Sequence, residues 1–429
     1  MTAPDSKAAP DAVVAQHAQS ALGTFEYDDY ITAKYGTELP TSNADNGLTL
    51  SELRGLSYDD PLWDDLMDQV DYSSSEIDAL LGNGSFNTSA LTSIGKGKTS
   101  ESDGPQAIGK TGVSDGTGAA CAYPAEVVIA ATWNVELAEA MGIAIGDEAL
   151  AQNSNGWYAP ACNIHRSPFL GRVYEYYSED AVLSGYMTAN VVQGASSRGY
   201  TCYIKHFAVN DQEAGRVAAM TWLDEQTLRE IYLKPFEMAV KLGEIEEKYL
   251  AEQEDGTYEV ETITRRAATG MMTSMNYIGG VWTSLDYSLD TEILRNEWGF
   301  EGAVITDSAT PESNEFLNAL SAGNDFWLSF MSPTLSDKTS VVAQWSIRQA
   351  VKNICYAVVN SNYMQYVGPG QEVSYTMSPW EIAIICMDVV LGVLSVAGVV
   401  WIVMRTLDEK KHPEKYKKHG KKEKTPQKQ

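Results

Sequence analysis

Short apolar segments alternate with amphipathic segments between about residues 123 and 330 of the chain. The apolar segments have the length of strands, and they are residues 127–131, 157–164, 203–208, 271–276, 303–306 and 325–328. The segments with helical spacing of apolar residues are 135–150, 179–194 and 224–242. Such alternation is typical of a parallel sheet with crossover helices, and a single run of this length favours a barrel. The sequence therefore predicts an α/β fold, a TIM-like (β/α)8 barrel.

Further elements are expected on both sides of this alternation. Residues 58–70 and 73–81 predict two helices, and residues 340–360 predict another. Residues 82–117 are rich in Gly, Ser and Lys, which is typical of a loop. Residues 241–266 are highly charged, and their length predicts a loop inserted at the surface.

One segment is apolar enough to cross a membrane. Residues 382–404 are predominantly apolar and long enough to span a bilayer core of about 30 Å. Asp388 lies inside the segment, near enough to one end for its carboxylate to reach the headgroups. A buried helix of a soluble protein is the alternative. The lysine-rich residues that follow favour a C-terminal transmembrane helix, because positive residues stay on the cytoplasmic side of a membrane.

Charge is distributed unevenly along the chain. The formal net charge is −27, whereas residues 405–429 carry ten Lys or Arg against four Asp or Glu. The expected location is the cell membrane, with a single span, the barrel outside the cytoplasm and the C-terminus inside it. The five regions that we expect are a linker or remnant of an upstream region (1–57), the barrel (58–365), a juxtamembrane linker (366–381), the transmembrane helix (382–404) and a basic cytoplasmic tail (405–429).

The first residues lack the basic and apolar regions of a signal peptide. A C-terminal anchor with an external domain normally needs such a signal, so we expect an upstream portion that is missing from this chain. Insertion without a signal is the alternative.

Composition argues against two kinds of site. A surface that binds nucleic acid needs clustered Lys and Arg, and most of this chain is acidic. The five cysteines are widely spaced and form no Cys-x-x-Cys pair, so neither a zinc site nor a disulfide framework is indicated. We expect no metal and no organic cofactor.

Asp307 is the first candidate for a catalytic group. It follows the apolar segment 303–306, and a carboxylate at the carboxyl end of a barrel strand projects into the mouth where such barrels carry their chemistry. An Asp that caps the next helix is the alternative. Two other motifs also have structural alternatives, because Asp103-Gly104-Pro105 is typical of a turn and Lys205-His206 can be an ordinary strand end.

Several motifs occur in a specific order along the chain. They are Asp103-Gly-Pro105, Asn155-Gly-Trp-Tyr-Ala-Pro-Ala161, Asn163-Ile-His-Arg-Ser-Pro-Phe-Leu-Gly-Arg172, Tyr174-Glu-Tyr-Tyr-Ser-Glu-Asp180, Lys205-His-Phe207, Arg229-Glu-Ile-Tyr-Leu-Lys-Pro-Phe-Glu237, Leu294-Arg-Asn-Glu-Trp-Gly-Phe300 and Ile305-Thr-Asp307. Together they resemble glycoside hydrolase family 3, in its β-glucosidase-like part, over about residues 58–330. The resemblance implies a barrel domain that is followed or preceded by an α/β sandwich domain.

The resemblance also implies roles for the matching residues. Asp307 falls at the nucleophile, which forms a glycosyl-enzyme intermediate. Asp103 would accept hydrogen bonds from hydroxyls of the non-reducing sugar. The other residues that would form the sugar pocket are Arg172, Lys205, His206, Arg216, Met272 and Met275. Arg172 and Lys205 would also help to keep nearby carboxylates ionised.

The sequence departs from the family at two positions near the nucleophile. Family members often have Tyr where Met275 stands, and many have Trp where this chain has Ser308. A hydrogen-bond donor and a sugar-stacking surface are therefore absent. His206 is not followed by the Pro-Gly-His-Gly loop of the β-N-acetylglucosaminidase branch, so we do not assign it as the acid/base.

The largest departure from the family is that no residue of the sequence matches the general acid. A retaining glycosidase needs a second carboxyl group about 5 to 5.5 Å from the nucleophile. In β-glucosidases of this family the sandwich domain supplies that Glu, and the sequence after Asp307 has no room for such a domain. Some members carry the sandwich ahead of the barrel, and the residues from Phe25 onward resemble the join in that reversed order.

The leading hypothesis is a retaining β-glycosidase that hydrolyses terminal β-D-glucosyl or similar residues of β-glucosides or oligosaccharides. A non-catalytic carbohydrate-binding remnant is the alternative. A third hypothesis is a two-chain glycosidase, in which a separate polypeptide supplies the acid/base.

Overall fold

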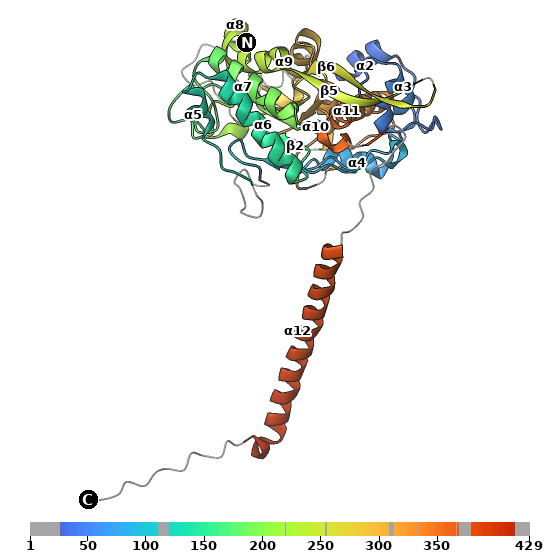
Figure 1. Cartoon of the computed structure of the whole chain (residues 1–429), viewed down its shortest axis with the longest axis vertical. Helices are drawn as coiled ribbons and strands as arrows, with labels where there is room; N and C mark the ends of the chain where they lie inside the picture. Colours follow the sequence, from blue (N-terminus) through green and yellow to red (C-terminus); the bar gives the residue numbers. More distant parts are fainter. Residues whose placement is uncertain are drawn as a thin grey trace, which may run out of the picture. The chain divides into compact units, whose positions relative to one another are not determined.

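The computed structural model describes residues 26–109, 120–218, 220–253, 255–308, 313–331, 333–365, 367–368 and 379–416 of the chain. The chain divides into two compact units, with the boundary at residues 373 and 374. The first unit holds a central sheet with helices outside it (Figure 1).

The sheet of the first unit consists of parallel strands. Its members are β1 (Glu101–Asp103), β2 (Gly156–Tyr158), β3 (Thr201–Phe207), β7 (Gly270–Thr273) and β10 (Ala303–Ile305), paired in the order β1-β2-β3-β7-β10. The predicted strands at 203–208, 271–276 and 303–306 are thus confirmed. The strand expected at 157–164 ends at Tyr158.

Two irregular segments close this sheet into a ring. Phe326 forms a parallel bridge with Ile305 of β10. The N–H of Trp327 donates to the Leu81 carbonyl at 2.7 Å, and the N–H of Glu101 in β1 donates to the Phe86 carbonyl at 2.8 Å. The expected eight-stranded barrel is therefore only partly correct, because the described residues form five regular strands and two irregular segments in the ring.

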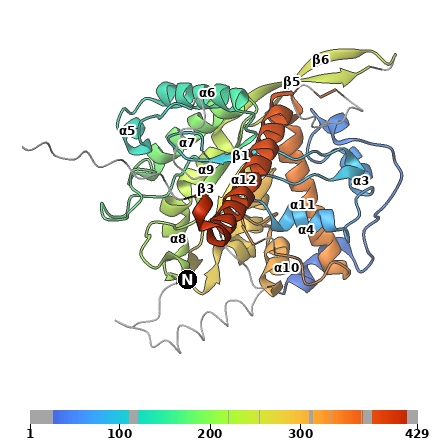
Figure 2. The same ribbon diagram turned by 90° about the horizontal axis from the view of Figure 1, so that it is seen from below.

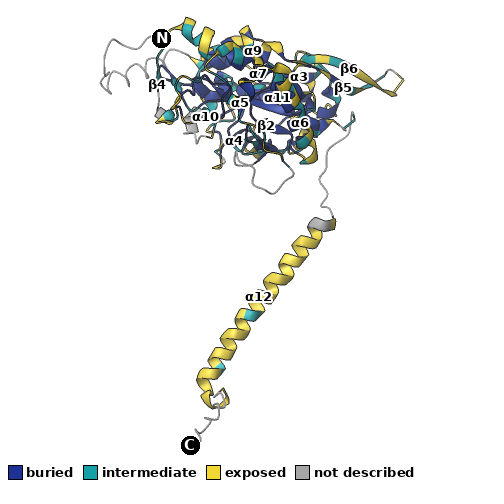
Figure 3. Ribbon diagram, turned by 60° about the vertical axis from the view of Figure 1, so that its left-hand side comes forward, coloured by how far each residue is buried: buried dark blue, intermediate teal, exposed yellow. Residues whose placement is uncertain are grey.

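Side chains of the strands alternate between the inside of the ring and the surrounding helices, as the period of a strand requires. Trp157, Ile204 and Val304 pack with the helices of one core cluster. Tyr158, Tyr203, Met272, Ile305 and Phe326 belong to a second cluster, which includes the interior of the ring and extends to α4 (Ser75–Gly82) and α11 (Val341–Val359). The buried strands appear dark blue at the centre of Figure 3.

The main helices lie outside the ring. They are α6 (Val135–Ala151), α7 (Ala181–Ser196), α9 (Lys234–Leu242), α10 (Ser313–Ala322) and α11 (Val341–Val359). The predictions of helices at 135–150, 179–194 and 340–360 are confirmed. Polar N-caps explain where they begin, because side-chain oxygens of Asn134, Asp180 and Ser340 accept hydrogen bonds from the first-turn N–H groups of α6, α7 and α11.

Glycines allow α6 and α7 to pack backbone against backbone. A Cβ atom at Gly142 of α6 would lie 2.2 Å from the Val191 carbonyl oxygen, and one at Gly194 of α7 would lie 2.2 Å from the Glu139 carbonyl oxygen. Any side chain at either position would force the helices apart.

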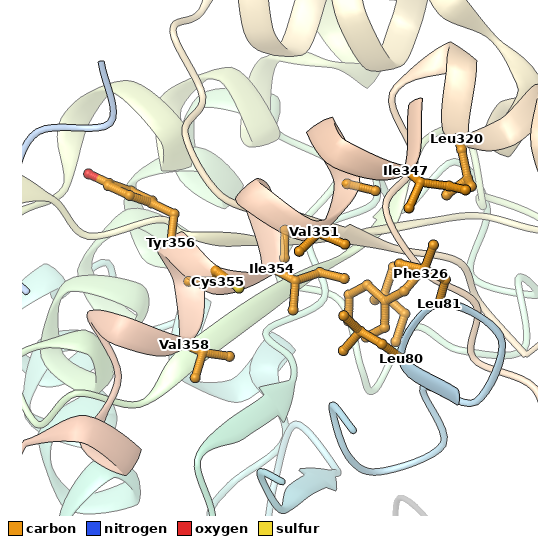
Figure 4. Packing of buried hydrophobic residues seen from close by; sticks show 14 of the residues in the cluster. Leu80, Leu81, Leu320, Phe326, Ile347, Val351, Ile354, Cys355, Tyr356 and Val358 are labelled. Atoms are coloured by element: carbon orange, nitrogen blue, oxygen red, sulfur yellow. The ribbon is translucent and has the colours of Figure 1, made fainter. Parts of the chain in front are cut away.

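Helix α11 covers the opposite side of the ring. Figure 4 shows Val351 and Ile354 of α11 beside Phe326 and Leu80. All four side chains are fully or almost fully buried. This contact joins the C-terminal part of the first unit to α4 (Ser75–Gly82), which the sequence predicted as a helix.

Residues 26–57 belong to the first unit and pack in it, which a linker would not do, whereas the alternative of a remnant of an upstream region stays a prediction. Helix α2 (Tyr27–Tyr35) packs against α11. Leu50 and Leu53 of η1 (Leu50–Leu53) are completely buried in the core. The residues between these two elements are mostly polar, so the composition of the segment did not predict that it packs in the core. Residues 1–25 lie outside the described part of the chain.

Two other segments form a different type of secondary structure from the one predicted. Residues 127–131 lie mainly in a short helix, α5 (Glu126–Ala130), because a short apolar run does not distinguish a strand from a helix. The predicted loop at 82–117 contains β1, whose sequence Glu-Ser-Asp has no apolar signal and whose pairing with β2 defines it.

The charged segment 241–266 forms a hairpin rather than a loop. Strands β5 (Glu244–Glu252) and β6 (Tyr258–Arg266) pair antiparallel, and the hairpin extends beyond the helices (Figure 2). At its base, Glu247 forms ion pairs with Arg54 and Arg265. Charged residues at inward positions obscured the strand period in the sequence.

The remaining elements of the first unit are short. The helical ones are α3 (Leu62–Met67), η2 (Thr92–Ile94), η3 (Arg216–Ala218), α8 (Glu225–Thr227), η4 (Leu228–Tyr232), η5 (Thr283–Leu285), η6 (Ser288–Glu297) and η7 (Asn362–Met364). The strands are β4 (Met220–Thr221), β8 (Tyr277–Ile278) and β9 (Val281–Trp282). The helix predicted at 58–70 corresponds to α3, and the one predicted at 224–242 is divided among α8, η4 and α9.

The second unit contains α12 (Pro379–Lys411) and η8 (Pro413–Lys415). Residues Ile382–Lys411 are long and apolar enough to cross a membrane by length and composition, and an 18-residue window within them has a mean hydropathy of 2.5. Their side chains are almost all exposed in the chain (Figure 3). Helix α12 thus extends past both ends of the predicted segment 382–404. Most of the expected juxtamembrane linker and the tail after residue 416 lie outside the described residues.

A buried carboxyl group lies inside the ring below its carboxyl-terminal end. Glu101 is within 2.6 Å of the Tyr158 hydroxyl and accepts a hydrogen bond from Tyr203 at 3.2 Å. Tyr158 already donates its single proton to the Gly84 carbonyl and accepts from the Phe86 N–H. A protonated Glu101 can donate to the Tyr158 oxygen in this geometry, and burial raises its pKa from 4.5 to about 7.

We expect Glu101 to make the fold less stable as pH rises. A carboxyl group whose pKa is raised on folding contributes its full stability below about pH 4.5, and this contribution is lost as pH rises to about 7. Glu101→Gln should abolish a pH-dependent part of roughly 3 kcal/mol between pH 4.5 and pH 8, measured by urea unfolding. The matched control is Glu246→Gln on the exposed face of the hairpin. Equal pH dependence in wild type and Glu101→Gln would refute the assignment.

Candidate active site

A cavity of about 510 Å³ opens at the carboxyl ends of the strands. Asp103 ends β1, Lys205 and His206 lie near the end of β3, and Asp307 lies two residues after β10. The irregular register between β3 and β7 at Ile204 and Phe207 accompanies the approach of both Lys205 and His206 to the cavity. The topology therefore brings together groups that are about two hundred residues apart in sequence.

Asp307 is held by its backbone and by one cation. Its N–H donates to the Thr273 carbonyl at 3.0 Å, and its Oδ1 accepts from the Ser308 N–H at 2.7 Å. Asp307 lines the cavity, and its Oδ2 lies 3.3 Å from Nη1 of Arg216. Burial raises the pKa of Asp307 above its ordinary value, and Arg216 is the strongest opposing influence. The two oxygens thus have different partners, a backbone N–H for Oδ1 and an arginine for Oδ2.

Asp307 is the last member of a continuous series of ion pairs along the cavity. The series alternates in charge, and its members in order are Asp103, Lys205, Glu175, Arg172, Glu213, Arg216 and Asp307. Each pair is separated by between 2.6 and 3.4 Å. We call this set the ion-pair series.

Lys205 is the most buried cation of the ion-pair series. Its Nζ lies 2.9 Å from both Asp103 Oδ1 and Glu175 Oε1, and only 4% of its side chain is exposed. Burial alone lowers the pKa of Lys205, but the two carboxylates raise it above its ordinary value. Burial raises the pKa of Glu175, yet Lys205 and Arg172 lower it to about 2. Both groups are therefore charged at neutral pH.

Glu213 orients both arginines. It accepts a hydrogen bond from Arg172 Nη1 at 3.3 Å and lies 3.4 Å from Nε of Arg216. The amide of Asn210 donates to it at 3.1 Å. Arg216 consequently presents its Nη1 to Asp307 while its Nε faces Glu213.

His206 is a neutral hydrogen-bond donor. Burial and the cations Arg172, Lys205 and Arg216 lower its pKa well below the ordinary value. The Tyr176 hydroxyl accepts from Asn210 at 3.0 Å and lies 3.3 Å from Nδ1 of His206, to which it can donate. The remaining proton of the ring is then on Nε2, which lies 3.9 Å from Asp307 Oδ2.

The rest of the cavity wall is mainly aromatic or apolar, with Gln106 and Ser308 as its polar members. The aromatic and apolar residues that line it are Phe86, Pro105, Tyr158, Tyr174, Met272, Leu328 and Phe330. Phe330 and Tyr174 are 68% and 52% exposed, respectively, whereas Tyr158 is buried. A flat ligand with polar edges therefore fits this cavity better than a purely ionic one.

Comparison with known proteins identifies the family. A model described as glycosyl hydrolase family 3 N terminal domain matches residues 109–354, which is more than half of the chain. The chain belongs to glycoside hydrolase family 3. The α/β fold is TIM-barrel-like, as in the solved structures of family 3 β-glucosidases to which it is similar.

Two curated relatives are β-glucosidases of bacteria. The chain is 35% identical to a β-glucosidase of Rhizobium radiobacter over 57% of this chain and 27% of the relative. It is 39% identical to β-glucosidase A of Butyrivibrio fibrisolvens over 43% of this chain and 20% of the relative. The chain thus spans about a quarter of the length of these relatives.

Two solved structures have a similar fold. β-Glucosidase 3B of Thermotoga neapolitana in complex with α-D-glucose is 28% identical with a TM-score of 0.57, covering 71% of this chain and 43% of that one. A β-glucosidase of Paenibacillus barengoltzii is 25% identical with a TM-score of 0.62, covering 82% and 38%.

The structure brings most of the predicted site residues of this family 3 chain into one cavity. Asp103, Arg172, Lys205, His206, Arg216, Met272 and Asp307 all line it. Met275 is not among the residues that line this cavity, and its place in the sugar pocket stays a prediction. Met275 lies beyond the end of β7, in the bend before β8, whereas Met272 is inside the strand and faces the cavity.

Sequence reasoning missed Glu175, Glu213 and Tyr176. Glu175 and Tyr176 lie within the motif from Tyr174 to Asp180, so their place in a matched motif was the available signal. For Glu213, the only signal in the sequence was its position three residues before Arg216. No group of His, Cys, Asp and Glu that could hold a metal ion occurs within the described ranges.

Lys205→Met should destabilise the barrel strongly. The change leaves the buried Glu175 without one of its two cations, and loss of one partner of a buried ion pair costs about 3 to 5 kcal/mol. The matched control is Arg198→Met, whose pair with Asp147 is exposed and is worth less than about 1 kcal/mol. Urea unfolding of both variants in the same detergent measures the difference. Similar losses in the two variants would contradict a structural role for the ion-pair series.

Proposed function

We propose that the chain is the barrel part of a retaining β-glycosidase that hydrolyses terminal non-reducing β-D-glucosyl or similar residues. The observation that carries this proposal is the position of Asp307, a carboxylate that lines a cavity together with hydroxyl-binding groups in a family 3 barrel. The β-glucosidase names of the relatives support the substrate class.

Asp307 is the nucleophile in this proposal. Its Oδ2 attacks the anomeric carbon, the glycosidic C–O bond breaks, and the electron pair leaves with the aglycone oxygen. A covalent glycosyl-enzyme ester results, which water then hydrolyses with return of the carboxylate. The hydrogen bond from the Ser308 N–H to Oδ1 keeps Oδ2 as the reacting atom.

The ion-pair series provides the sugar-binding groups. Asp103 is more exposed than Lys205 and accepts hydrogen bonds from sugar hydroxyls. Arg172, Lys205, Arg216 and the Nε2–H of His206 donate to hydroxyl oxygens. Met272 and Tyr158 form the apolar part of the pocket.

The general acid is not supplied by the described cavity wall. Its carboxyl groups besides Asp307 are Asp103, Glu175 and Glu213, and each is ion-paired with one or two cations. Such pairs keep a carboxylate ionised, which is unsuited to donating a proton. We propose that the acid comes from an upstream domain or from a separate chain, as the greater length of the relatives allows.

The apolar helix supports a location at the cell membrane. We propose that α12 spans the bilayer once, with the barrel outside the cytoplasm and the basic residues after Arg405 inside it. No nucleic acid, metal or organic cofactor takes part in this proposal.

A non-catalytic carbohydrate-binding role is the second candidate. The observation that favours it is the ion pairing of every other carboxyl group in the cavity wall, because a site without an acid can bind sugars without turning over natural glycosides.

An aryl β-glucoside with an activated leaving group separates the two candidates. Its departure needs little protonation, so Asp307 can form the glycosyl-enzyme without the acid. We expect a burst of about one aryl alcohol per chain followed by slow turnover, and Asp307→Ala should abolish the burst. The control is Asp147→Ala on the surface. A normal burst in Asp307→Ala, or none in wild type, would falsify the catalytic proposal.

Arg216 should set the pH dependence of this burst. Removing its charge raises the pKa of Asp307 further, and the attacking form is the ionised one. Arg216→Gln should therefore move the acidic limb of the glycosylation rate to higher pH by about one pH unit. Arg198→Gln on the surface is the control. An unchanged acidic limb in Arg216→Gln would show that another group controls it.

A further inference from the structure

Charged and apolar residues occupy different parts of the wall of the Asp307 cavity. The ion-pair series lines the wall from Asp103, at the end of β1, to Asp307, after β10. Two irregular segments close the ring between β10 and β1, and their described residues that line the cavity are Phe86, Leu328 and Phe330. The cavity is therefore charged on one side and apolar on the other.

Phe330 is the outermost of three aromatic rings that contact one another along the apolar side. Its ring centroid lies 6.2 Å from that of Phe86, and Phe86 stacks on Tyr158 at 5.6 Å with an interplanar angle of 28°. Exposure increases along this row, because Tyr158 is buried, Phe86 is half-buried and Phe330 is 68% exposed. All three residues line the cavity. Phe330 consequently lies at the mouth of the cavity, and Tyr158 lies at its floor.

The segment that carries Phe330 runs beside the segment that carries Asp307. The N–H of Thr306 donates to the Phe326 carbonyl at 3.2 Å, and the N–H of Leu328 donates to the Thr306 hydroxyl oxygen at 3.1 Å. Asp307 follows Thr306, and Phe330 lies two residues after Leu328. The phenyl ring and the carboxyl group therefore belong to adjacent parts of the cavity wall.

Hydrogen bonds hold the backbone around Phe330 although its ring is exposed. The Ser85 hydroxyl donates to the Ser329 carbonyl at 2.7 Å, and the N–H of Met331 donates to the Ser329 hydroxyl oxygen at 3.1 Å. The residues on both sides of Phe330 are thus fixed. A ring on a fixed backbone loses little conformational freedom when a ligand stacks on it.

The closed floor of the cavity sets the orientation of a bound glycoside. The rings of Tyr158, Tyr203 and Phe326 contact one another below the cavity, so a ligand enters through the mouth. A terminal sugar whose hydroxyls reach the ion-pair series occupies the inner part, and its aglycone remains at the mouth.

The chemistry of the mouth beside Asp307 favours an apolar aglycone. The side chains of Phe86, Leu328 and Phe330 present only aromatic and aliphatic carbon, so they offer no partner to the hydroxyls of a second sugar. A flat apolar ring gains contact area and an aromatic stacking interaction at the same position.

We infer that Phe330 determines specificity for the leaving group, because it selects β-glucosides of flat apolar aglycones, such as aryl groups, by stacking on the aglycone. The inference rests on the proposed function for the identity of the sugar, and it adds the class of aglycone. Phe330 takes no part in binding the terminal sugar itself.

The test compares two ligands that share a sugar and differ in aglycone, phenyl 1-thio-β-D-glucoside and methyl 1-thio-β-D-glucoside. Each is titrated calorimetrically into the full chain in lipid nanodiscs, because alkyl glycoside detergents would compete for the cavity. Phe330→Ala should lower the affinity for the phenyl ligand about tenfold and leave the affinity for the methyl ligand unchanged. Phe330→Tyr keeps the ring and should retain most of the affinity for the phenyl ligand.

The matched control is Phe169→Ala, because Phe169 is 92% exposed and is not among the residues that line the cavity. This variant should bind both ligands as wild type does. Equal losses for the two ligands in Phe330→Ala would overturn the inference. An unchanged affinity for the phenyl ligand would also overturn it, and would assign the exposed ring to a contact with another protein domain.

The proposed function has its own control in the same titration. Asp103→Asn should weaken the binding of both ligands to a similar degree, because both contain the same sugar. Unchanged affinities in Asp103→Asn would count against the cavity as a sugar site without affecting the comparison of the two ligands at Phe330.

Discussion

The alternation of charge from Asp103 to Asp307 is the interaction on which the site depends. Seven side chains from different strands and loops form consecutive ion pairs, and each charge has an opposite charge as its neighbour. Isolated, several of these groups would be too costly to bury in the ionised form. Joined in series, they hold the Asp307 carboxyl group beside a cation at the edge of an apolar ring.

The ring supplies the positions that this series requires. Successive inward-facing residues of a strand are two apart, so β1 presents Glu101 below and Asp103 above, and β3 presents Tyr203 below and Lys205 above. Tyr158, Tyr203 and Phe326 make edge-to-face contacts at 5.6 and 5.9 Å under the cavity. The layer of aromatic rings excludes water from below, which strengthens the electrostatic interactions above it.

The sequence made the parallel α/β architecture and most of the site predictable, for identifiable reasons. Apolar strands such as 303–306 carry a clear pattern, and ordered motifs located Asp307, Lys205 and Arg172. The strand Glu101–Asp103 carries no apolar pattern, because its pairing partner defines it. The hairpin of β5 and β6 was not predicted, because charged residues occupy inward positions and break the alternation of apolar and polar residues. One of them is Glu247, which is ion-paired with Arg54 and Arg265. Glu213 was missed because its role depends on two arginines that only the fold brings to it.

The central claim is that Asp307 is the ionised nucleophile at the end of the ion-pair series. Incubation of the full chain with a 2-deoxy-2-fluoro β-glucoside that has an activated leaving group tests it directly, because fluorine slows hydrolysis of the glycosyl-enzyme and the leaving group needs no acid. Mass spectrometry of peptides should locate one fluoroglycosyl group on Asp307. A label on Asp103, Glu175 or Glu213, or no label despite binding of the sugar, would contradict the account.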